Sequence, residues 1–176
     1  MPLTVAERGQ TIATFRFIEV RLMEIAAAWV PTTPEMEVKV LLGKHIWDFA
    51  QHADALGKRT FELRLPEQFS QRPSDVYVQL LDGVAAIEDT ARRLTALYDA
   101  LLPGVERRYL RYIERTDTLL DAPSVVIVER ILQDLVRQRR EVGSLRGETG
   151  LMPANAEDLR RQDGSLDTVV VLRGEA

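Results

Sequence analysis

Residues 37–64 constrain the fold more than any other stretch, because they hold both histidines of the 176-residue chain beside its most regular apolar stripe. At roughly 100° per residue, this stripe falls on one face of an α-helix. Its members are Val38, Leu42, Phe49, Ala53 and Leu56. Proline and acidic residues at positions 34–37 suit a first helical turn. We therefore predict a long amphipathic helix that closes at Leu65-Pro66.

Both histidines lie on the flank of this stripe. His45 and His52 fall within about 40–60° of its centre on a helical wheel. Asp48 stands between them at steps of three and four residues, so the three side chains can meet. Two interpretations follow. Either each imidazole sits at a core boundary and bonds to an acid of its own helix, or the cluster supplies ligands for zinc or iron. One helix face alone does not complete a coordination sphere.

A first helix is predicted over residues 4–30. Its apolar stripe at helical spacing comprises Ile12, Phe15, Ile18, Leu22, Ile25 and Trp29. The connection at residues 31–34 is short, which makes the first two helices antiparallel neighbours.

Glu19 is the carboxylate of the first helix whose position allows it to face His45 or His52. It falls at the edge of the apolar stripe, whereas Glu24 points to the opposite side. Of the two interpretations, we favour the one in which Glu19 pairs with an arginine at the core boundary, such as Arg16 or Arg59.

Two further helices complete the predicted bundle. Ser74 or Asp75 caps the third, whose stripe continues past a kink or short break near Pro103. Glu88 lies roughly 80° from the centre of that stripe, so it is a marginal inward candidate. The fourth helix follows Pro123 and covers residues 124–142.

From Gly143 onward the composition predicts an irregular tail with one helical turn at residues 156–161. Residues 167–173, DTVVVLR, are β-prone. Because an isolated strand is not stable, we expect this short strand to pair with a second copy. The predicted organisation is thus a helical domain at residues 1–145 and a tail at 146–176.

Composition narrows the functional classes. With 23 basic and 27 acidic residues, the net charge of −4 argues against a nucleic-acid surface. No apolar run reaches the ~20 residues of a membrane span, so no membrane partner is expected. The absence of cysteine excludes disulfides and thiolate ligands, and it is compatible with the reducing cytoplasm that we expect as the location.

Two segments of the chain are alike. Residues 21–24 (RLME) and 111–114 (RYIE) each lead, at nearly the same spacing, to a helix that begins at a proline. This pattern predicts two helical hairpins related by a pseudo-twofold. Two hairpins with a long connection resemble the ferritin-like four-helix bundle over residues 4–142. The expected fold is therefore all-α, with four main helices running up and down.

The resemblance implies a place for two iron ions. Families of this fold commonly hold them with a glutamate from each of two helices and a Glu-x-x-His from each of the others. This chain has no Glu-x-x-His; its second helix offers His45-x-x-Asp48 and Asp48-x-x-x-His52 instead. The helix after Pro123 has no histidine, and its Glu129 points poorly inward. About half of the implied site is present.

Three functions fit these observations. The first is a binding, scaffold or assembly module without redox chemistry or cofactor, acting as a homo-oligomer or a subunit of a larger assembly, with room for a small-molecule ligand. The second is a metal-dependent oxidoreductase or oxygenase using iron, manganese or zinc at Glu19, His45, Asp48, His52 and Glu88. The third is a metal-free enzyme in which a histidine acts as general base, oriented by Asp48. The missing ligand motifs favour the first.

Overall fold

The structure is a computed structural model that describes residues 3–166, and every regular element within them is a helix. The elements are α1 (Val5–Trp29), the 3-10 turn η1 (Val30–Thr32), α2 (Met36–Glu62), α3 (Asp75–Ala85), α4 (Thr90–Leu94), the π-helical segment η2 (Thr95–Leu101), α5 (Leu102–Arg115), α6 (Ala122–Thr149) and α7 (Glu157–Ser165). The all-α prediction is confirmed. The strand predicted at residues 167–173 lies outside the described residues.

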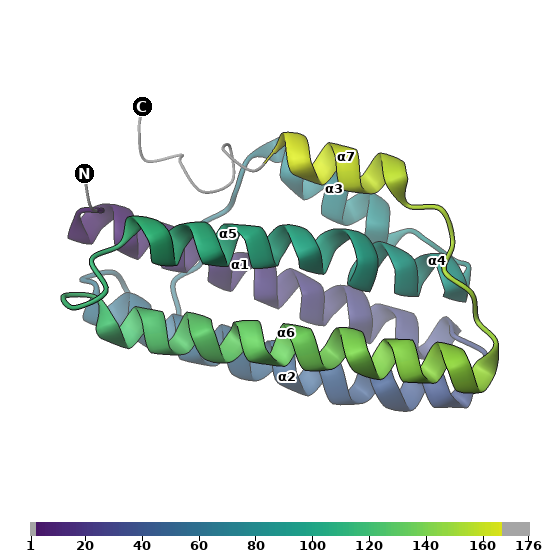
Figure 1. The fold of residues 1–176 in the computed structure, drawn as a ribbon. Coiled ribbons are helices and arrows are strands. Elements are labelled where there is room, and N and C mark those ends of the chain that lie inside the picture. The colour runs from purple at the N-terminus through teal and green to yellow at the C-terminus, as the bar shows by residue number, and fades with distance from the viewer. Residues whose placement is uncertain (1–2, 167–176) are drawn as a thin grey trace.

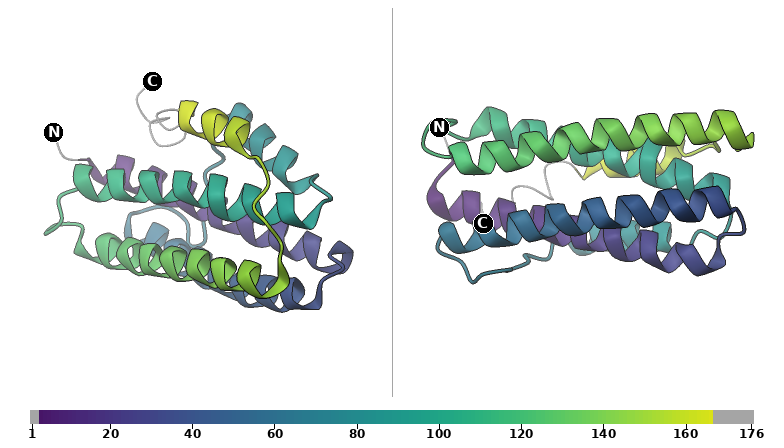
Figure 2. Two further views of the ribbon diagram at one scale, coloured as in Figure 1. Left: turned by 45° about the vertical axis from the view of Figure 1, so that its right-hand side comes forward. Right: turned by 90° about the horizontal axis from the view of Figure 1, so that it is seen from below.

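The long helices lie side by side (Figure 1). Helices α1 and α2 pack against each other as the predicted antiparallel neighbours, joined by η1. Helix α6 lies beside α2, and α5 lies beside α1 on the opposite side of the molecule (Figures 1 and 2). The shorter helices α3 and α7 pack together on the side of α1 and α5 away from α2 and α6.

The third predicted helix is interrupted at a different place from the one expected. The chain leaves the helix at residues 86–89, where the Asp89 side chain caps α4 by accepting from the backbone N–H of Arg92 at 2.9 Å. Helix then continues through Pro103 without a break. A proline at this position cannot donate to the Asp99 carbonyl one turn earlier. Arg160 Nε of α7 donates to that carbonyl instead, at 2.8 Å.

Helix α6 is longer than expected. It continues through Gly143 and Gly147 and ends at Gly150, whose φ of 73° is the left-handed conformation of a helix C-terminus. The prediction of a tail from Gly143 is therefore wrong, and the boundary placed at residue 145 falls within α6. Leu145 is buried beyond the point where the helix was expected to end, and this packing offsets the helix-weakening effect of the glycines, about 1 kcal/mol each.

Helix α7 is anchored to the helical body. Asp163 is fully buried and accepts from Arg108 Nη2 at 2.9 Å and from Arg107 Nη2 at 3.0 Å. Residues 157–165 therefore form a helix that packs on η2, α3 and α5, where an irregular tail with one helical turn was expected. No helix within residues 3–166 is both long and apolar enough to cross a membrane.

Candidate functional site

The centre of the site is His52 of α2, held between two carboxylates. Its Nδ1 lies 3.1 Å from Glu19 Oε2 of α1, and its Nε2 lies 3.1 Å from Asp134 Oδ2 of α6. The Tyr109 hydroxyl of α5 donates to the other oxygen of Glu19 at 2.5 Å. His52 is only 4% exposed and Glu19 is fully buried. One polar cluster thus joins four helices.

The partners of His52 determine its charge. Carboxylates only accept hydrogen bonds, so an imidazole that bonds to one on each side must donate from both nitrogens, which is the protonated form. Burial by itself lowers the pKa of His52. The negative charge of Glu19 and the hydrogen bonds to Glu19 and Asp134 outweigh this effect, so the pKa is raised above its ordinary value. His52 is therefore a buried imidazolium.

His45, two turns earlier on α2, has different partners. Its Nδ1 lies 2.7 Å from the Tyr98 hydroxyl of η2, and its Nε2 lies 2.9 Å from Glu141 Oε2 of α6. Burial raises the pKa of Tyr98, so the phenol keeps its proton and donates it to Nδ1. Burial also lowers the pKa of His45, and Glu141 offsets this only in part. His45 is therefore neutral and donates from Nε2 to Glu141.

Arg137 of α6 connects the two histidine clusters. Its Nη2 donates to Asp134 at 2.8 Å and to Asp48 at 2.9 Å, and its Nη1 donates to Glu141 at 3.3 Å. Burial would raise the pKa of Glu141, but hydrogen bonds from Lys44, His45 and Arg137 lower it to about 2. Burial would also raise the pKa of Asp134, but hydrogen bonds from Arg137 and His52 lower it, so both acids of α6 that face the histidines are held in their charged form.

Several predictions about these residues are confirmed. Both histidines point into the protein, and Glu19 is the first-helix acid on the inward side, while Glu24 is exposed and pairs with Arg21. Glu129 is exposed, as its position on the wheel indicated.

Three interpretations are wrong. Glu19 pairs with neither arginine: Arg16 bonds to side chains of the loop after α2, and Arg59 bonds to Asp121 and Ser124 at the start of α6. Asp48 does not bond to a histidine of its own helix but accepts from Arg137 and Gln138 of α6. Glu88 is exposed in the break between α3 and α4, so it does not face the histidines.

Sequence reasoning missed the residues that α6 contributes. Asp134 bonds to His52, Gln138 to Asp48, and Glu141 to His45. Residue numbers therefore increase along α6 in the direction in which they decrease along α2. This is the register of two antiparallel helices. The signal in the sequence was the acid-arginine-acid spacing of Asp134, Arg137 and Glu141, which places all three on one helix face.

The network offers little to a metal ion. Within residues 3–166, no group of three or more His, Asp or Glu side chains is arranged to hold one. The edge of the network does reach solvent: His52 and Asp134 line a groove of about 430 Å³ between α2 and α6.

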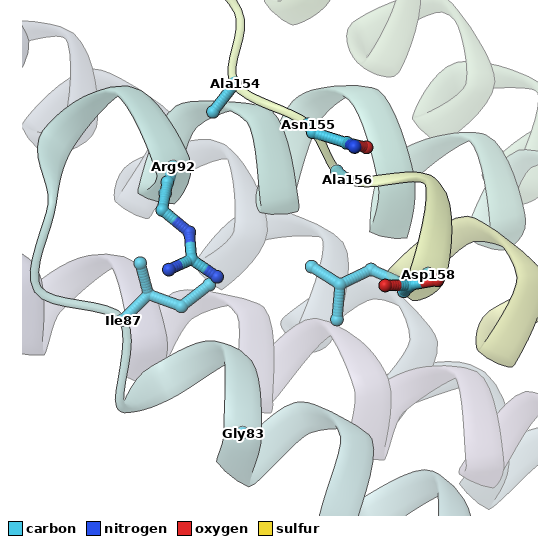
Figure 3. Close-up of a pocket in the computed structure, with 8 residues that line it drawn as sticks. Gly83, Ile87, Arg92, Ala154, Asn155, Ala156 and Asp158 are labelled. Atoms are coloured by element: carbon cyan, nitrogen blue, oxygen red, sulfur yellow. The ribbon is translucent and has the colours of Figure 1, made fainter.

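A larger cavity lies away from the histidines. It has a volume of about 540 Å³ and lies between the α3–α4 break and the segment leading into α7. Figure 3 shows Ile87 and the Arg92 guanidinium on one side of it and Asp158 on the other, with residues 154–156 along its edge. Its lining contains no histidine and no pair of acids, so it carries none of the predicted chemistry.

Comparison with protein-family models, with curated proteins and with solved structures finds no match to this chain.

Proposed function

We propose that this chain is a ferritin-like bundle that acts as a binding or assembly module without redox chemistry. One observation carries the proposal: both ring nitrogens of each histidine are already bonded to protein groups. A metal ion or a substrate proton needs a free nitrogen lone pair. In this network the His52 nitrogens both carry protons, and the one lone pair of His45 accepts from Tyr98.

The arrangement of the helices supports the ferritin-like part of the proposal. Helices α1 and α2 form one antiparallel pair, and α5 and α6 form another. The connection between the pairs is long and contains α3. This matches two hairpins with a crossover.

The network has a structural role in this proposal, which is to select one register of α2 against α6. Sliding α6 by one turn would separate His52 from Asp134 and His45 from Glu141. A buried charge that loses its partner costs about 3–5 kcal/mol, and a buried polar group that loses its hydrogen bond costs about 1–3 kcal/mol. Displaced registers are therefore strongly disfavoured, which keeps the outer surface in one shape.

A metal-dependent oxidoreductase is the second candidate, and one observation favours it. Glu19, His52 and Asp134 converge from three helices, and the edge formed by the last two borders a groove of about 430 Å³. Metal binding would first have to remove a proton from His52, and the raised pKa of this imidazole opposes that step near neutral pH. His45 and Asp48 bond elsewhere and do not complete the set.

Metal analysis of protein purified without chelators separates the two candidates. For the module we expect no stoichiometric iron, manganese or zinc, and a His52→Ala variant that loses stability but no metal. Gln133→Ala, at an exposed position of α6 outside this groove, is the control and should match the wild type. Stoichiometric metal that disappears in His52→Ala, but not in Gln133→Ala, would establish the oxidoreductase candidate.

A further inference from the structure

The outer face of α2 and α6 carries exposed apolar side chains. On α2, Met36, Val40 and Trp47 are 65%, 67% and 66% exposed, and on α6 Val126 is 63% exposed. Figure 2 (right) shows these two helices running side by side, and no helix of the described chain crosses their outer face there. A tryptophan left this exposed in the middle of a long helix is typical of an interaction surface.

Two grooves lie along this face, one on each side of its middle. The first, of about 540 Å³, is lined at the Met36 end by Met36, Val40, Leu41 and Leu145 together with charged residues. The second, of about 430 Å³, is lined at the other end by Trp47, Ala55, Val126, Ile127 and Ile131 with charged residues of its own. Each end thus has an apolar depression.

The unpaired charges of the two grooves have opposite sign. Glu37 and Glu148 line the first groove, and Arg130 lines the second, and none of the three forms an ion pair within residues 3–166. Lys58 also lines the second groove, where it pairs with Asp54, while Asp48 and Asp134 of the same groove pair with Arg137. The unpaired charges of the face are therefore negative at one end and positive at the other.

We infer that this face binds a second copy of the chain, with the two α2 helices antiparallel and Trp47 beside the twofold axis. The inference rests on the proposed assembly role and names the partner. Glu37 lies ten residues before Trp47, and Lys58 eleven residues after it. A twofold axis in the interface, perpendicular to the helices, therefore places Glu37 opposite the partner's Lys58.

The same axis pairs the charges of α6. The α2–α6 register places position 139 of α6 beside Trp47, and Glu148 and Arg130 each lie nine residues from that position. Glu148 therefore faces the partner's Arg130. A twofold axis parallel to the helices would instead place Glu37 opposite the partner's Glu148, which brings like charges together. Charge complementarity selects the antiparallel dimer.

The face is large enough for a dimer. From Met36 to Lys58 it is about 33 Å long at ~1.5 Å per residue. Two adjacent helices, each about 10 Å across with side chains, give a footprint of roughly 600 Å², somewhat below the ≈800 Å² per partner of a standard interface. We therefore expect a dimer that dissociates on dilution.

Sedimentation velocity over a concentration series tests the face. Trp47→Glu should weaken dimerisation at least tenfold and leave the helical circular dichroism unchanged, because the side chain is exposed. Leu110→Glu is the matched control: Leu110 is an exposed apolar residue of α5, on the other side of the molecule, and its variant should dimerise like the wild type. A wild type that stays monomeric, or a Trp47→Glu variant that dimerises normally, overturns the inference.

A mixing experiment tests the antiparallel register. Glu148→Arg alone and Arg130→Glu alone should each dimerise several-fold more weakly, since each then opposes like charges. Mixing the two variants should restore dimers, because in the mixed dimer both pairs are again of opposite sign. Mixed variants that fail to recover overturn the register and with it the proposed dimer.

A further deletion distinguishes this dimer from one built on the terminal segment. Removing residues 167–176 should leave dimerisation through α2 and α6 intact, and loss of the dimer on that deletion overturns the inference. Failure of the proposed function has a different signature, which is stoichiometric metal lost in His52→Ala.

Discussion

His45 and His52 lie two turns apart on the same face of α2, both are buried, and each bonds to a carboxylate of α6, yet their pKa values shift in opposite directions. The difference lies in the second partner. His45 accepts from a phenol, whereas His52 donates to a second carboxylate, Glu19. Burial lowers the pKa of both rings, and only a carboxylate at each nitrogen reverses that effect.

The comparison assigns different roles to the two clusters. The His52 cluster is ionic, and its partners come from α1 and α6, so it ties both of these helices to α2. The His45 cluster is a relay of hydrogen bonds that ends at a charged acid near the surface, where Glu141 also meets Lys44 at 2.6 Å. The charge of each ring therefore depends on its second partner, which is Glu19 of α1 for His52 and Tyr98 of η2 for His45.

The largest expected effect follows from removing the acid that distinguishes the two rings. Glu19→Gln leaves His52 with one carboxylate, and we expect the free energy of unfolding to fall by about 3–5 kcal/mol, as for a buried ion pair that loses one partner. The pKa of His52 should fall as well, because the charge of Glu19 is its main raising influence. Urea unfolding and an NMR titration of the ring measure the two effects.

Glu24→Gln is the matched control: this exposed acid of the same helix pairs only with Arg21 at the surface, so its loss should change the free energy of unfolding by at most about 1 kcal/mol and leave the pKa of His52 unchanged. If the pKa of His52 stayed raised in Glu19→Gln, Asp134 alone would be enough, and the contrast with His45 would need another cause.

Tyr98→Phe tests the neutral cluster and should have a smaller effect. It removes the donor to His45 Nδ1 and leaves one buried acceptor without a partner, at a cost of about 1–3 kcal/mol. Tyr109→Phe removes a bond to the charged Glu19, and bonds to charged groups contribute about 1.5–3 kcal/mol, so this variant should be destabilised at least as much. Urea unfolding of both variants gives the order, and a larger loss in Tyr98→Phe would contradict it.

The pH dependence of stability sharpens the comparison further. The folded pKa of His45 is lowered, so stability is lost as the pH falls below the unfolded value of 6.5 toward the folded pKa. The folded pKa of His52 is raised, so its contribution is fully present below 6.5 and is lost as the pH rises through the folded pKa. Each tenfold difference in proton affinity between the folded and unfolded chain corresponds to about 1.4 kcal/mol.

Single substitutions separate these two contributions. Urea unfolding at a series of pH values measures the free energy of unfolding. In His45→Gln this free energy should decrease less as the pH falls below 6.5, and in His52→Gln it should decrease less as the pH rises above 6.5. Glu141, with a pKa of about 2, adds a further loss between its ordinary value of 4.5 and pH 2 in both variants. Identical pH profiles for the two variants would rule out opposite charges on the rings.

Much of the helical framework could be predicted from the sequence. The spacing of apolar residues set the paths of α1 and α2 and turned both histidines and Glu19 inward. The exceptions have local causes. The Asp89 cap starts a new helix where a continuous apolar stripe predicted none, and the packing of Leu145 carries α6 past two glycines. The periodicity of apolar residues shows which face of a helix is buried. It does not reveal a short break such as residues 86–89, or a helix that continues past a glycine because later residues are buried.

By itself, then, the sequence determined an all-helical arrangement of the main elements, with two inward imidazoles on the second helix and one inward acid on the first. Only the tertiary structure decided which acids of α6 meet them, and so which ring is charged. The reason is physical: helical periodicity follows from local backbone geometry, whereas these hydrogen bonds join residues 82 and 96 positions apart and depend on how two helices slide against each other. The spacing of residues within one helix does not specify its axial position against the other helix.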